Sequence, residues 1–310
     1  MMSRDNAPVS QSDAALARQR WTDGDQPKTH LLVHSQRDVP DAVEQLVFLS
    51  DLHGLFQPLE AFEHELARLS QQRQLVFVGD HCHRGPHAPQ VVAWLHQQVG
   101  PFAVMGNHDE DMFAEPVGDE PIYTAVGAFG FYPQHHREYV RGWPHRLALR
   151  WRGMTIVVWH GHINAKAELC PWLITPERQM SCFPEPEADL VVLGHSHYAY
   201  VRQQSNTTYA NAGSMGWTVV GTMDEAGQVI TQSGRPALGI EDDTRSSYLR
   251  VTADGGRLTV DIVRFSDDRQ AALRDMEQAG LPNMERFRGW FQDGLMNRPT
   301  GPEGKLRWNR

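Results

Sequence analysis

Side chains that can bind metals follow five short apolar runs of the sequence. The runs are QLVFL (45–49), QLVFV (74–78), FAVM (102–105), TIVVW (155–159) and LVVL (190–193). After them come, in turn, Asp51 and His53; Asp80; Asn107, His108 and Asp109; His160 and His162; and His195 and His197. One Asp or His after a strand is usually a cap or turn residue, but five successive cases favour a shared site. Carboxylate, amide and imidazole ligands together suit borderline divalent metals.

A second candidate is the run GDHCHRG (79–85), which places a Cys between two His. Adjacent residues diverge by about 100° in a helix and about 180° in a strand, so one ion rarely collects all three. Structural zinc sites instead use Cys and His pairs roughly two to five residues apart. The other cysteines, Cys170 and Cys182, stand alone. The His-Cys-His run by itself therefore does not establish a metal site.

The elements that must position these residues are strands and helices in alternation. The apolar runs are typical of strands buried on both faces. Between the first two lies PLEAFEHELARLSQQ (58–72), and between the next two APQVVAWLHQQ (88–98), and both are predicted helices. This order predicts an α/β layered fold. Ligands in open α/β sheets bind beyond the carboxyl ends of the strands, so the polar residues there can converge.

The later sequence favours antiparallel strands. Hairpins are predicted to turn at Arg152–Gly153 and at Asp254–Gly256, so we expect a second, more antiparallel sheet. DDRQAALRDMEQAG (267–280) predicts a helix, and the apolar run at 31–33 an edge strand. We divide the chain into an N-terminal extension at 1–45, partly disordered, the domain that carries the candidate site at 46–266, and a C-terminal helical extension and tail at 267–310.

The composition excludes several classes of protein. Of 310 residues 40% are hydrophobic, and 29 Lys and Arg against 38 Asp and Glu give a net charge of −9. This balance argues against a surface that coats nucleic acid. Three cysteines give no disulfide framework, which suits a reducing cytoplasm. No apolar run reaches the roughly 18 residues of a membrane span, and the polar N-terminus lacks a signal core. We expect a cytoplasmic protein without a membrane partner.

Five motifs in order resemble those of the calcineurin-like metallophosphoesterases. They are SDLHG (50–54), GDHCHRG (79–85), GNHDE (106–110), WHGH (159–162) and GHSH (194–197). NAGS (211–214) is similar to a segment that follows GHxH in small bacterial phosphodiesterases of this superfamily. The resemblance implies two packed mixed β-sheets with helices on the outer faces, a four-layer α/β/β/α sandwich.

The resemblance also implies a site with two divalent metal ions. Asp51, His53 and His197 would bind one ion, Asn107, His160 and His195 the second, and Asp80 would bridge them. Two cations about 3.5–4 Å apart need a shared anion, which explains an Asp at position 80. By the same resemblance Arg84 would bind phosphate, His108 would be the general acid, and Asp109 would orient its imidazole. Mn²⁺ is favoured among Mn²⁺, Fe²⁺/Fe³⁺, Zn²⁺ and Ni²⁺.

The sequence departs from the related GDxxDRG form at His83, where that form has an Asp that supports the catalytic His. The exchange bears on the tuning of His108 rather than on metal binding. His81, Cys82 and His87 are expected to be structural or solvent-facing. Elsewhere we expect His162 to support the site or contact substrate. We expect His135 and His136 to lie on a surface helix and Cys170 and Cys182 to be buried. The tryptophans expected in the core are Trp143, Trp151, Trp159 and Trp217.

The function implied is hydrolysis of small phosphomonoesters, phosphodiesters or nucleotides by a metal-activated water. RGPHAPQVVAWL followed by MGNHDE also favours the branch of protein serine/threonine phosphatases and diadenosine tetraphosphatases, so this alternative stays open. A third hypothesis is a metal-stabilised scaffold without catalysis. Such a scaffold has little need of His108 or Arg84 beside two metals. The expected partner is a small phosphorylated substrate.

Overall fold

The computed structural model describes residues 32–111, 113, 132–161, 183, 185–218, 221–223, 229–230, 244–281, 284, 287–288 and 295–296. The helices are α1 (Gln57–Leu66), α2 (Ala88–Gln98), α3 (Asn107–Asp111), α4 (Gln134–Arg141) and α6 (Arg269–Gln278). The strands are β1 (His34–Asp38), β2 (Gln45–Leu49), β3 (Arg73–Phe77), β4 (Arg146–Trp151), β5 (Met154–Trp159), β6 (Leu190–Leu193), β7 (Tyr200–Gln204), β8 (Thr207–Asn211), β9 (Gly221–Met223), β10 (Val229–Ile230), β11 (Ser246–Asp254), β12 (Arg257–Phe265) and β13 (Leu295–Met296).

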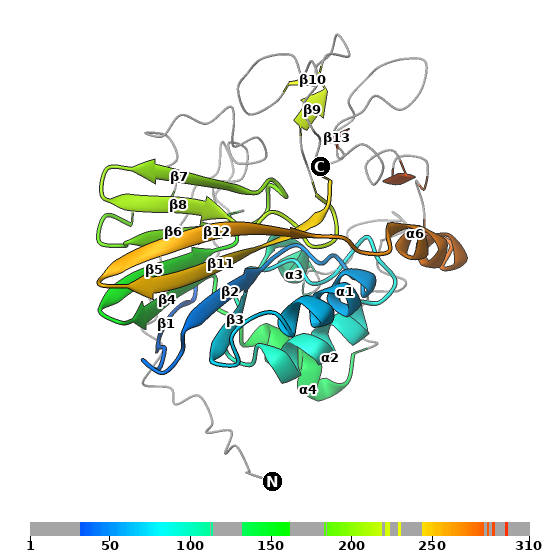
Figure 1. The fold of residues 1–310 in the computed structure, drawn as a ribbon. Coiled ribbons are helices and arrows are strands. Elements are labelled where there is room, and N and C mark those ends of the chain that lie inside the picture. The colour runs from blue at the N-terminus through cyan, green and yellow to red at the C-terminus, as the bar shows by residue number, and fades with distance from the viewer. Residues whose placement is uncertain are drawn as a thin grey trace, which may run out of the picture.

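Two mixed sheets make up the body of the fold (Figure 1). The four-stranded sheet has the order β12-β11-β2-β3, with β2 and β3 parallel and β11 antiparallel to both of its neighbours. The six-stranded sheet has the order β1-β4-β5-β6-β8-β7, with β5, β6 and β8 parallel. A small third sheet joins β10, β9 and β13. The expected fold of two mixed sheets with helices is confirmed.

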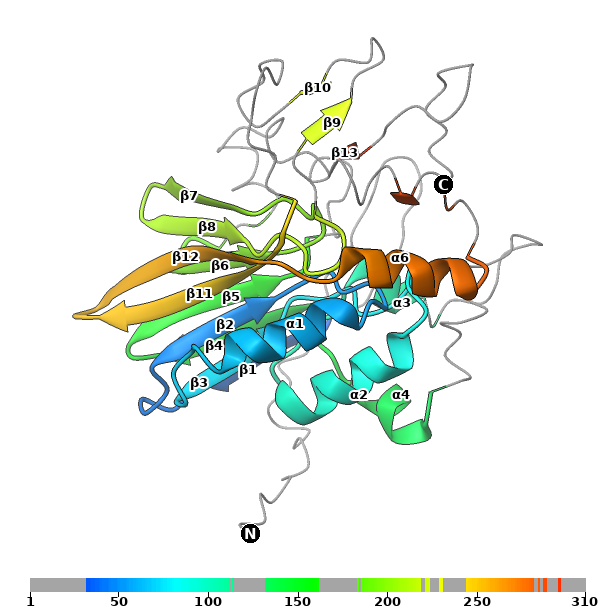
Figure 2. The same ribbon diagram turned by 45° about the vertical axis from the view of Figure 1, so that its right-hand side comes forward.

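The alternation of side chains along β2 and β3 explains why their sequences are apolar throughout. Leu46, Phe48, Val76 and Val78 pack between the sheets against residues of β5 and β6 such as Ile156. Val47, Leu49, Leu75 and Phe77 point the other way, into a core shared with α1, α2 and α4. Both faces of these strands are therefore buried, and the helices form an outer layer over the four-stranded sheet (Figure 2).

Most of the predicted elements are found. The predicted helices correspond to α1, α2 and α6, and the two predicted hairpins to β4–β5 and β11–β12. The third predicted strand is reduced to one bridge, between Phe77 and Ala103, in which the backbone of Phe77 donates to the Phe102 carbonyl and accepts from the N–H of Val104. The five predicted strands are also divided between the two sheets, two of them as β2 and β3 and two as β5 and β6.

Both terminal segments contribute elements to the described fold. The edge strand predicted at 31–33 is found further along the chain, because β1 begins at His34; it lies within the proposed N-terminal extension and pairs in parallel with β4 at the edge of the six-stranded sheet. At the other end, α6 packs on Leu55 and Trp217 through Ala272, Leu273 and Met276. Among the described residues, no helix combines the length and apolar character needed to cross a bilayer.

Candidate metal centre

The predicted ligands lie in the loops that leave β2, β3, β5 and β6 and at the start of α3. Asp51 and His53 follow β2, Asp80 follows β3 and His160 follows β5. His195 and His197 follow β6, and Asn107 opens α3. Because both sheets direct carboxyl ends to this region, ligands from two sheets meet there. Asp51, His53, Asp80, His160 and His197 are buried, whereas Asn107 and His195 are partly exposed.

The backbone of these loops is held in an unusual conformation. φ is +54° at Asp51, +47° at His53, +63° at Asp80, +66° at His195 and +58° at His197. For a residue other than glycine, a left-handed backbone conformation is unfavourable by about 1–3 kcal/mol. It persists where surrounding contacts enforce it. All five residues were predicted as metal ligands. The strain is therefore concentrated on the loops that aim the candidate ligands.

Three imidazoles present the same nitrogen to the centre. In each of them Nδ1 lies close to a backbone carbonyl. The distance is 3.1 Å from His53 to Cys82, 2.7 Å from His160 to Val78 and 2.6 Å from His197 to Trp217. A carbonyl oxygen only accepts, so each Nδ1 carries the proton. In the neutral ring Nε2 then bears a lone pair, as in histidines that bind metals.

The first set of donors contains Asp51, His53 and His197, whose ligand atoms lie within 4.8 Å of one another. The Nε2 atoms of the two histidines are 3.0 Å apart. Asp51 Oδ1 lies 3.2 Å from Nε2 of His197. Asp51 Oδ2 accepts hydrogen bonds from Ser50 Oγ at 2.5 Å and from the backbone N–H of His195 at 3.1 Å, which leaves Oδ1 facing the rings. A carboxylate and two imidazoles in this arrangement fit a divalent ion.

The second set contains Asp80, His160 and His195, again within 4.8 Å. Asp80 Oδ2 lies 3.2 Å from His160 Nε2 and 3.7 Å from His53 Nε2, so this carboxylate faces ligands of both sets. Asn107 Oδ1 lies 2.9 Å from His195 Nδ1, which places the amide beside the second set. The structure thus brings together all seven predicted metal ligands, with Asp80 between the two sets.

Two glycines permit this close packing. A Cβ on Gly106 would clash with the carboxylate and backbone of Asp80, and a Cβ on Gly79 would lie 2.6 Å from His160 Nδ1. Gly79 also has φ +98°, in the region that favours glycine. The glycines of the GD and GNH motifs therefore leave room for the ligands that adjoin them.

The charges of the site favour bound cations. Burial opposes a charge on His160, but the facing Asp80 carboxylate raises its pKa to about 10. Burial also opposes ionisation of Asp51, yet its interactions with His197 and His160 lower its pKa below the usual value. Burial and the nearby Arg84 lower the pKa of His53 well below its usual value, which keeps that ring neutral. A metal would replace the proton on His160.

Asp109 acts differently from its predicted role. Its carboxylate accepts hydrogen bonds from the backbone N–H groups of Asp80, His81 and Gly106 at 2.8–2.9 Å. Its Oδ1 also lies 2.5 Å from His81 Nδ1. The expectation that Asp109 orients His108 is corrected, because its carboxylate is bound to His81 and to the backbone of two ligand loops. Tyr132 contacts the far side of His81, with its hydroxyl 3.4 Å from Nε2.

His108 lies at the partly exposed edge of the centre. Its backbone N–H donates to Asp80 Oδ1 at 2.9 Å, and its Nε2 lies 3.3 Å from Arg84 Nη2. His83 contacts the other ring nitrogen, with the two Nδ1 atoms 2.8 Å apart. The predicted proximity of His83 and His108 is confirmed. Arg84 also stacks over Trp217, with Cζ 5.9 Å from the ring centroid.

The NAGS motif supports the ligand loops. Asn211 Nδ2 donates to the Gly194 carbonyl at 2.6 Å, and Ser214 Oγ donates to the Asp51 carbonyl at 2.8 Å. The same Ser214 hydroxyl accepts from the backbone N–H of Trp217 at 2.7 Å. Sequence reasoning identified the motif through its resemblance but missed Ser50, Ser214 and Trp217 as supports.

The remaining predictions that fall on described residues agree with the structure. Cys82 and His81 are fully buried, which fits structural roles, and Trp143, Trp151, Trp159 and Trp217 are core residues as expected. His135 and His136 lie on α4, with His135 exposed and His136 partly so. His162, Cys170 and Cys182 lie outside the described residues.

Comparison with known proteins agrees with this geometry. Residues 45–231, more than half of the chain, match the model of the calcineurin-like phosphoesterase superfamily domain. The chain therefore belongs to this superfamily, and it is a metal-dependent enzyme that hydrolyses phosphate esters. No curated protein sequence is significantly similar to it.

Two solved structures show the same fold. A metallophosphoesterase from Sphaerobacter thermophilus is 19% identical, with a TM-score of 0.56, over 81% of this chain and 99% of that one. A hypothetical protein from Pyrococcus horikoshii OT3 is 14% identical, also with a TM-score of 0.56, over 77% of this chain and 94% of that one. At these identities the likeness extends to the fold alone.

Proposed function

We propose that the chain hydrolyses small phosphomonoesters, phosphodiesters or nucleotides at a centre of two divalent metal ions. The observation that carries this proposal is the placement of Asp80. Its carboxylate faces His160 Nε2 at 3.2 Å and His53 Nε2 at 3.7 Å, between two sets of metal-binding side chains. One carboxylate shared by two cations offsets their repulsion.

The ligands divide around Asp80. In the proposal Asp51, His53 and His197 hold one ion, and Asn107, His160 and His195 hold the other. Divalent ions, when bound, supply polarisation of the phosphoryl oxygens and a nucleophile formed from water at neutral pH. Mn²⁺ is our first choice, because carboxylate and amide oxygens accompany the imidazoles.

Arg84 and His108 have separate roles in this proposal. The Arg84 guanidinium offers paired N–H donors to phosphate oxygens, and its stacking on Trp217 fixes its direction. His108 donates a proton to the leaving oxygen. Its Nε2 is 3.3 Å from Arg84 Nη2, so a phosphate bound by Arg84 lies within reach of the imidazole. Asp109 serves as a positioning residue that holds the loops of Asp80 and Gly106 together.

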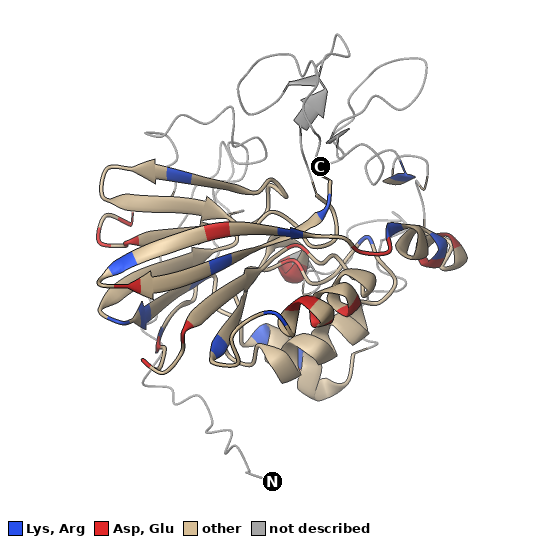
Figure 3. Cartoon of the chain, in the orientation of Figure 1, with Lys and Arg blue, Asp and Glu red and all other residues tan. Residues whose placement is uncertain are grey.

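The distribution of charged residues argues against a nucleic-acid partner. Figure 3 shows Lys and Arg interspersed with Asp and Glu over the described strands and helices. Together with the net charge of −9, this distribution favours a small phosphorylated partner over a nucleic-acid surface. A cytoplasmic location, expected from the cysteine content, is part of the proposal.

The test is hydrolysis of p-nitrophenyl phosphate and bis-p-nitrophenyl phosphate with added Mn²⁺. The wild type should hydrolyse at least one of them, and the ratio of the two rates identifies a monoesterase or a diesterase. Asp80→Asn should be inactive, because it removes the shared charge. Cys82→Ala, a buried neighbour without a ligand role, should keep its activity. Metal-loaded protein that hydrolyses neither ester would contradict the small-substrate proposal.

A further inference from the structure

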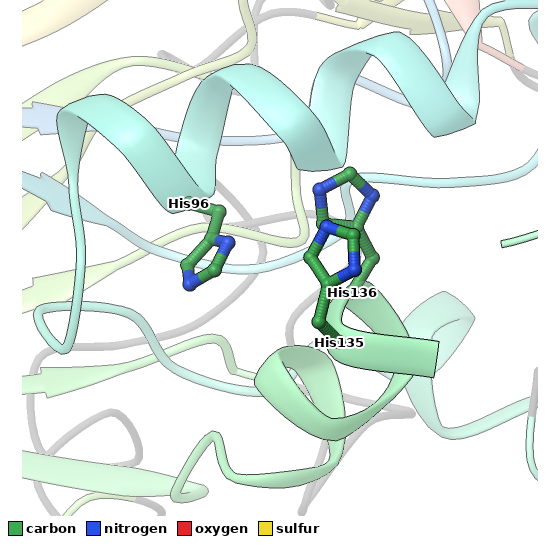
Figure 4. A group of neighbouring side chains, drawn as sticks. All are labelled: His96, His135 and His136. Atoms are coloured by element: carbon green, nitrogen blue, oxygen red, sulfur yellow. The ribbon is translucent and has the colours of Figure 1, made fainter. Parts of the chain in front are cut away.

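Three histidines of two neighbouring helices form a cluster apart from the candidate metal centre. His96 lies in the last turn of α2, and His135 and His136 lie in the first turn of α4. Figure 4 shows the His96 side chain extending from α2 toward α4, and the other two extending from α4 toward α2. One ligand nitrogen from each ring lies within 4.8 Å of the other two. The cluster shares no residue with the centre at the strand ends.

The rings already contact one another. The ring centroids of His135 and His136 are 4.1 Å apart, and that of His96 lies 5.8 Å from His136 and 6.0 Å from His135. Nδ1 of His136 is buried and has no hydrogen-bond partner among the described residues. A buried imidazole nitrogen without a partner is costly, and a metal ion is one group that satisfies it.

We propose that His96, His135 and His136 form a second metal site, which binds Zn²⁺ or a similar borderline divalent ion and ties α2 to α4. Imidazole ligands without carboxylates favour Zn²⁺, Cu²⁺, Ni²⁺ and Co²⁺ over Mn²⁺ and Mg²⁺. Three protein ligands leave a fourth position of a tetrahedral zinc site to water.

Rotation of exposed side chains can close the site around an ion. Nitrogens bound to one tetrahedral zinc ion at about 2.1 Å each lie about 3.4 Å apart. The observed limit of 4.8 Å is wider than this, and His96 and His135 are exposed, so their side chains can rotate inward to close the site. Burial and the neighbouring His135 lower the pKa of His96 and of His136, which favours the neutral rings that bind metals.

The helices are already joined at this point by Tyr139. Its hydroxyl donates to the carbonyls of Leu95 and Gly100 at the end of α2, and its ring stacks on His96 with centroids 4.5 Å apart. The site is therefore built on two packed helices. A metal would add a link between positions 96 and 135, far apart in sequence, and would stabilise the folded chain by binding it in preference to the unfolded one.

The test is the number of Zn²⁺ ions bound at equilibrium by the full chain. We expect His96→Ala and His136→Ala each to bind one equivalent fewer than the wild type. His64→Ala is the matched control, because His64 is also an exposed histidine in the last turn of a helix, α1. It should bind as many ions as the wild type. Hydrolysis supported by Mn²⁺ should be unchanged in all three variants, since none of them alters the centre at the strand ends.

Thermal unfolding gives a second readout. Saturating Zn²⁺ should raise the Tm of the wild type by roughly 2–5 °C more than that of His96→Ala. Equal stoichiometry and equal shifts in Tm for the wild type and His96→Ala would overturn the proposal. A loss of one equivalent in His64→Ala as well would also overturn it, because binding would then follow exposed histidines in general.

Discussion

His83 Nδ1 lies 2.8 Å from His108 Nδ1, with the two ring planes at 86°. Only one proton fits on the line between these atoms, so one ring donates and the other accepts. Burial lowers the pKa of His83 to about 4. Burial, Arg84 and His83 lower the pKa of His108 well below its usual value. A histidine in place of the Asp of related sequences thus disfavours the protonated form of the proposed general acid.

The first prediction concerns the pH dependence of turnover in His83→Asp. A carboxylate at position 83 favours the imidazolium form of His108 and raises its pKa. A general acid works only while protonated, so the alkaline limb of the profile should move to higher pH. The measurement is kcat against pH at saturating Mn²⁺. His83→Asn, which adds no charge, is the control and should move the limb much less. A limb of His83→Asp that stays in place or moves to lower pH would show that His83 does not tune His108.

The second prediction separates proton donation from substrate binding. His108→Ala should lower kcat by about 10²–10⁴-fold for alkyl phosphates, whose leaving oxygens are strongly basic, and by less for nitrophenyl esters. Arg84→Ala should slow both kinds of substrate to a similar extent, because it removes a contact to the phosphate that they share. Equal losses across leaving groups in His108→Ala would mean that this residue only positions the substrate.

The third prediction tests the buried carboxylate of Asp109. Asp109→Asn puts an amide among three backbone donors and His81, so we expect the free energy of unfolding to fall by roughly 3–5 kcal/mol. Urea unfolding measures this loss. The control is Asp189→Asn, an exposed carboxylate that accepts from the backbone N–H of Thr155 and should cost much less. Equal losses in the two variants would exclude a special role for the Asp109 network.

The fourth prediction concerns Ser214, which supports the site without facing the metals. Its hydroxyl joins the Asp51 carbonyl to the backbone N–H of Trp217, whose own carbonyl accepts from His197. Groups that orient metal ligands typically change metal affinity by about 10–100-fold when removed. Ser214→Ala should weaken Mn²⁺ binding by that factor.

Ser247→Ala is the matched control for this prediction, because Ser247 is equally buried and its hydroxyl donates to the Ala212 carbonyl. It should leave the Mn²⁺ affinity close to that of the wild type. Isothermal titration of both variants with Mn²⁺ decides the matter. If the two variants bind Mn²⁺ equally well, the Ser214 hydroxyl does not help to orient the metal ligands.

Much of the fold follows from local sequence patterns. The apolar runs of β2 and β3 are continuous because these strands bury one face between the sheets and the other under helices. The turns at Gly153 and at Gly255–Gly256 have positive φ, so the glycines mark both hairpins. The division of the runs between two sheets could not be predicted, because strand pairing depends on contacts distant in sequence. β2 pairs with β11, about 200 residues later.

The ligands of the site were predictable because each follows an apolar run, whereas their supports were not. Ser50 and Ser214 carry no signal of function in isolation, and the Trp217 carbonyl is a backbone group that any residue would supply. Asp109 was assigned to His108 because the two are adjacent in sequence. Their side chains diverge at the start of α3, and that of Asp109 turns inward to His81.

The central claim is a centre of two metal ions joined by Asp80, and the most direct test is the number of Mn²⁺ ions bound per chain. Mn²⁺ is suited to this count because a cluster of imidazoles alone binds it weakly. The wild type should bind two equivalents, Asn107→Ala about one, and Asp80→Asn fewer than two with much lower affinity. A wild type that binds a single equivalent, unchanged in Asn107→Ala, would contradict the dinuclear centre.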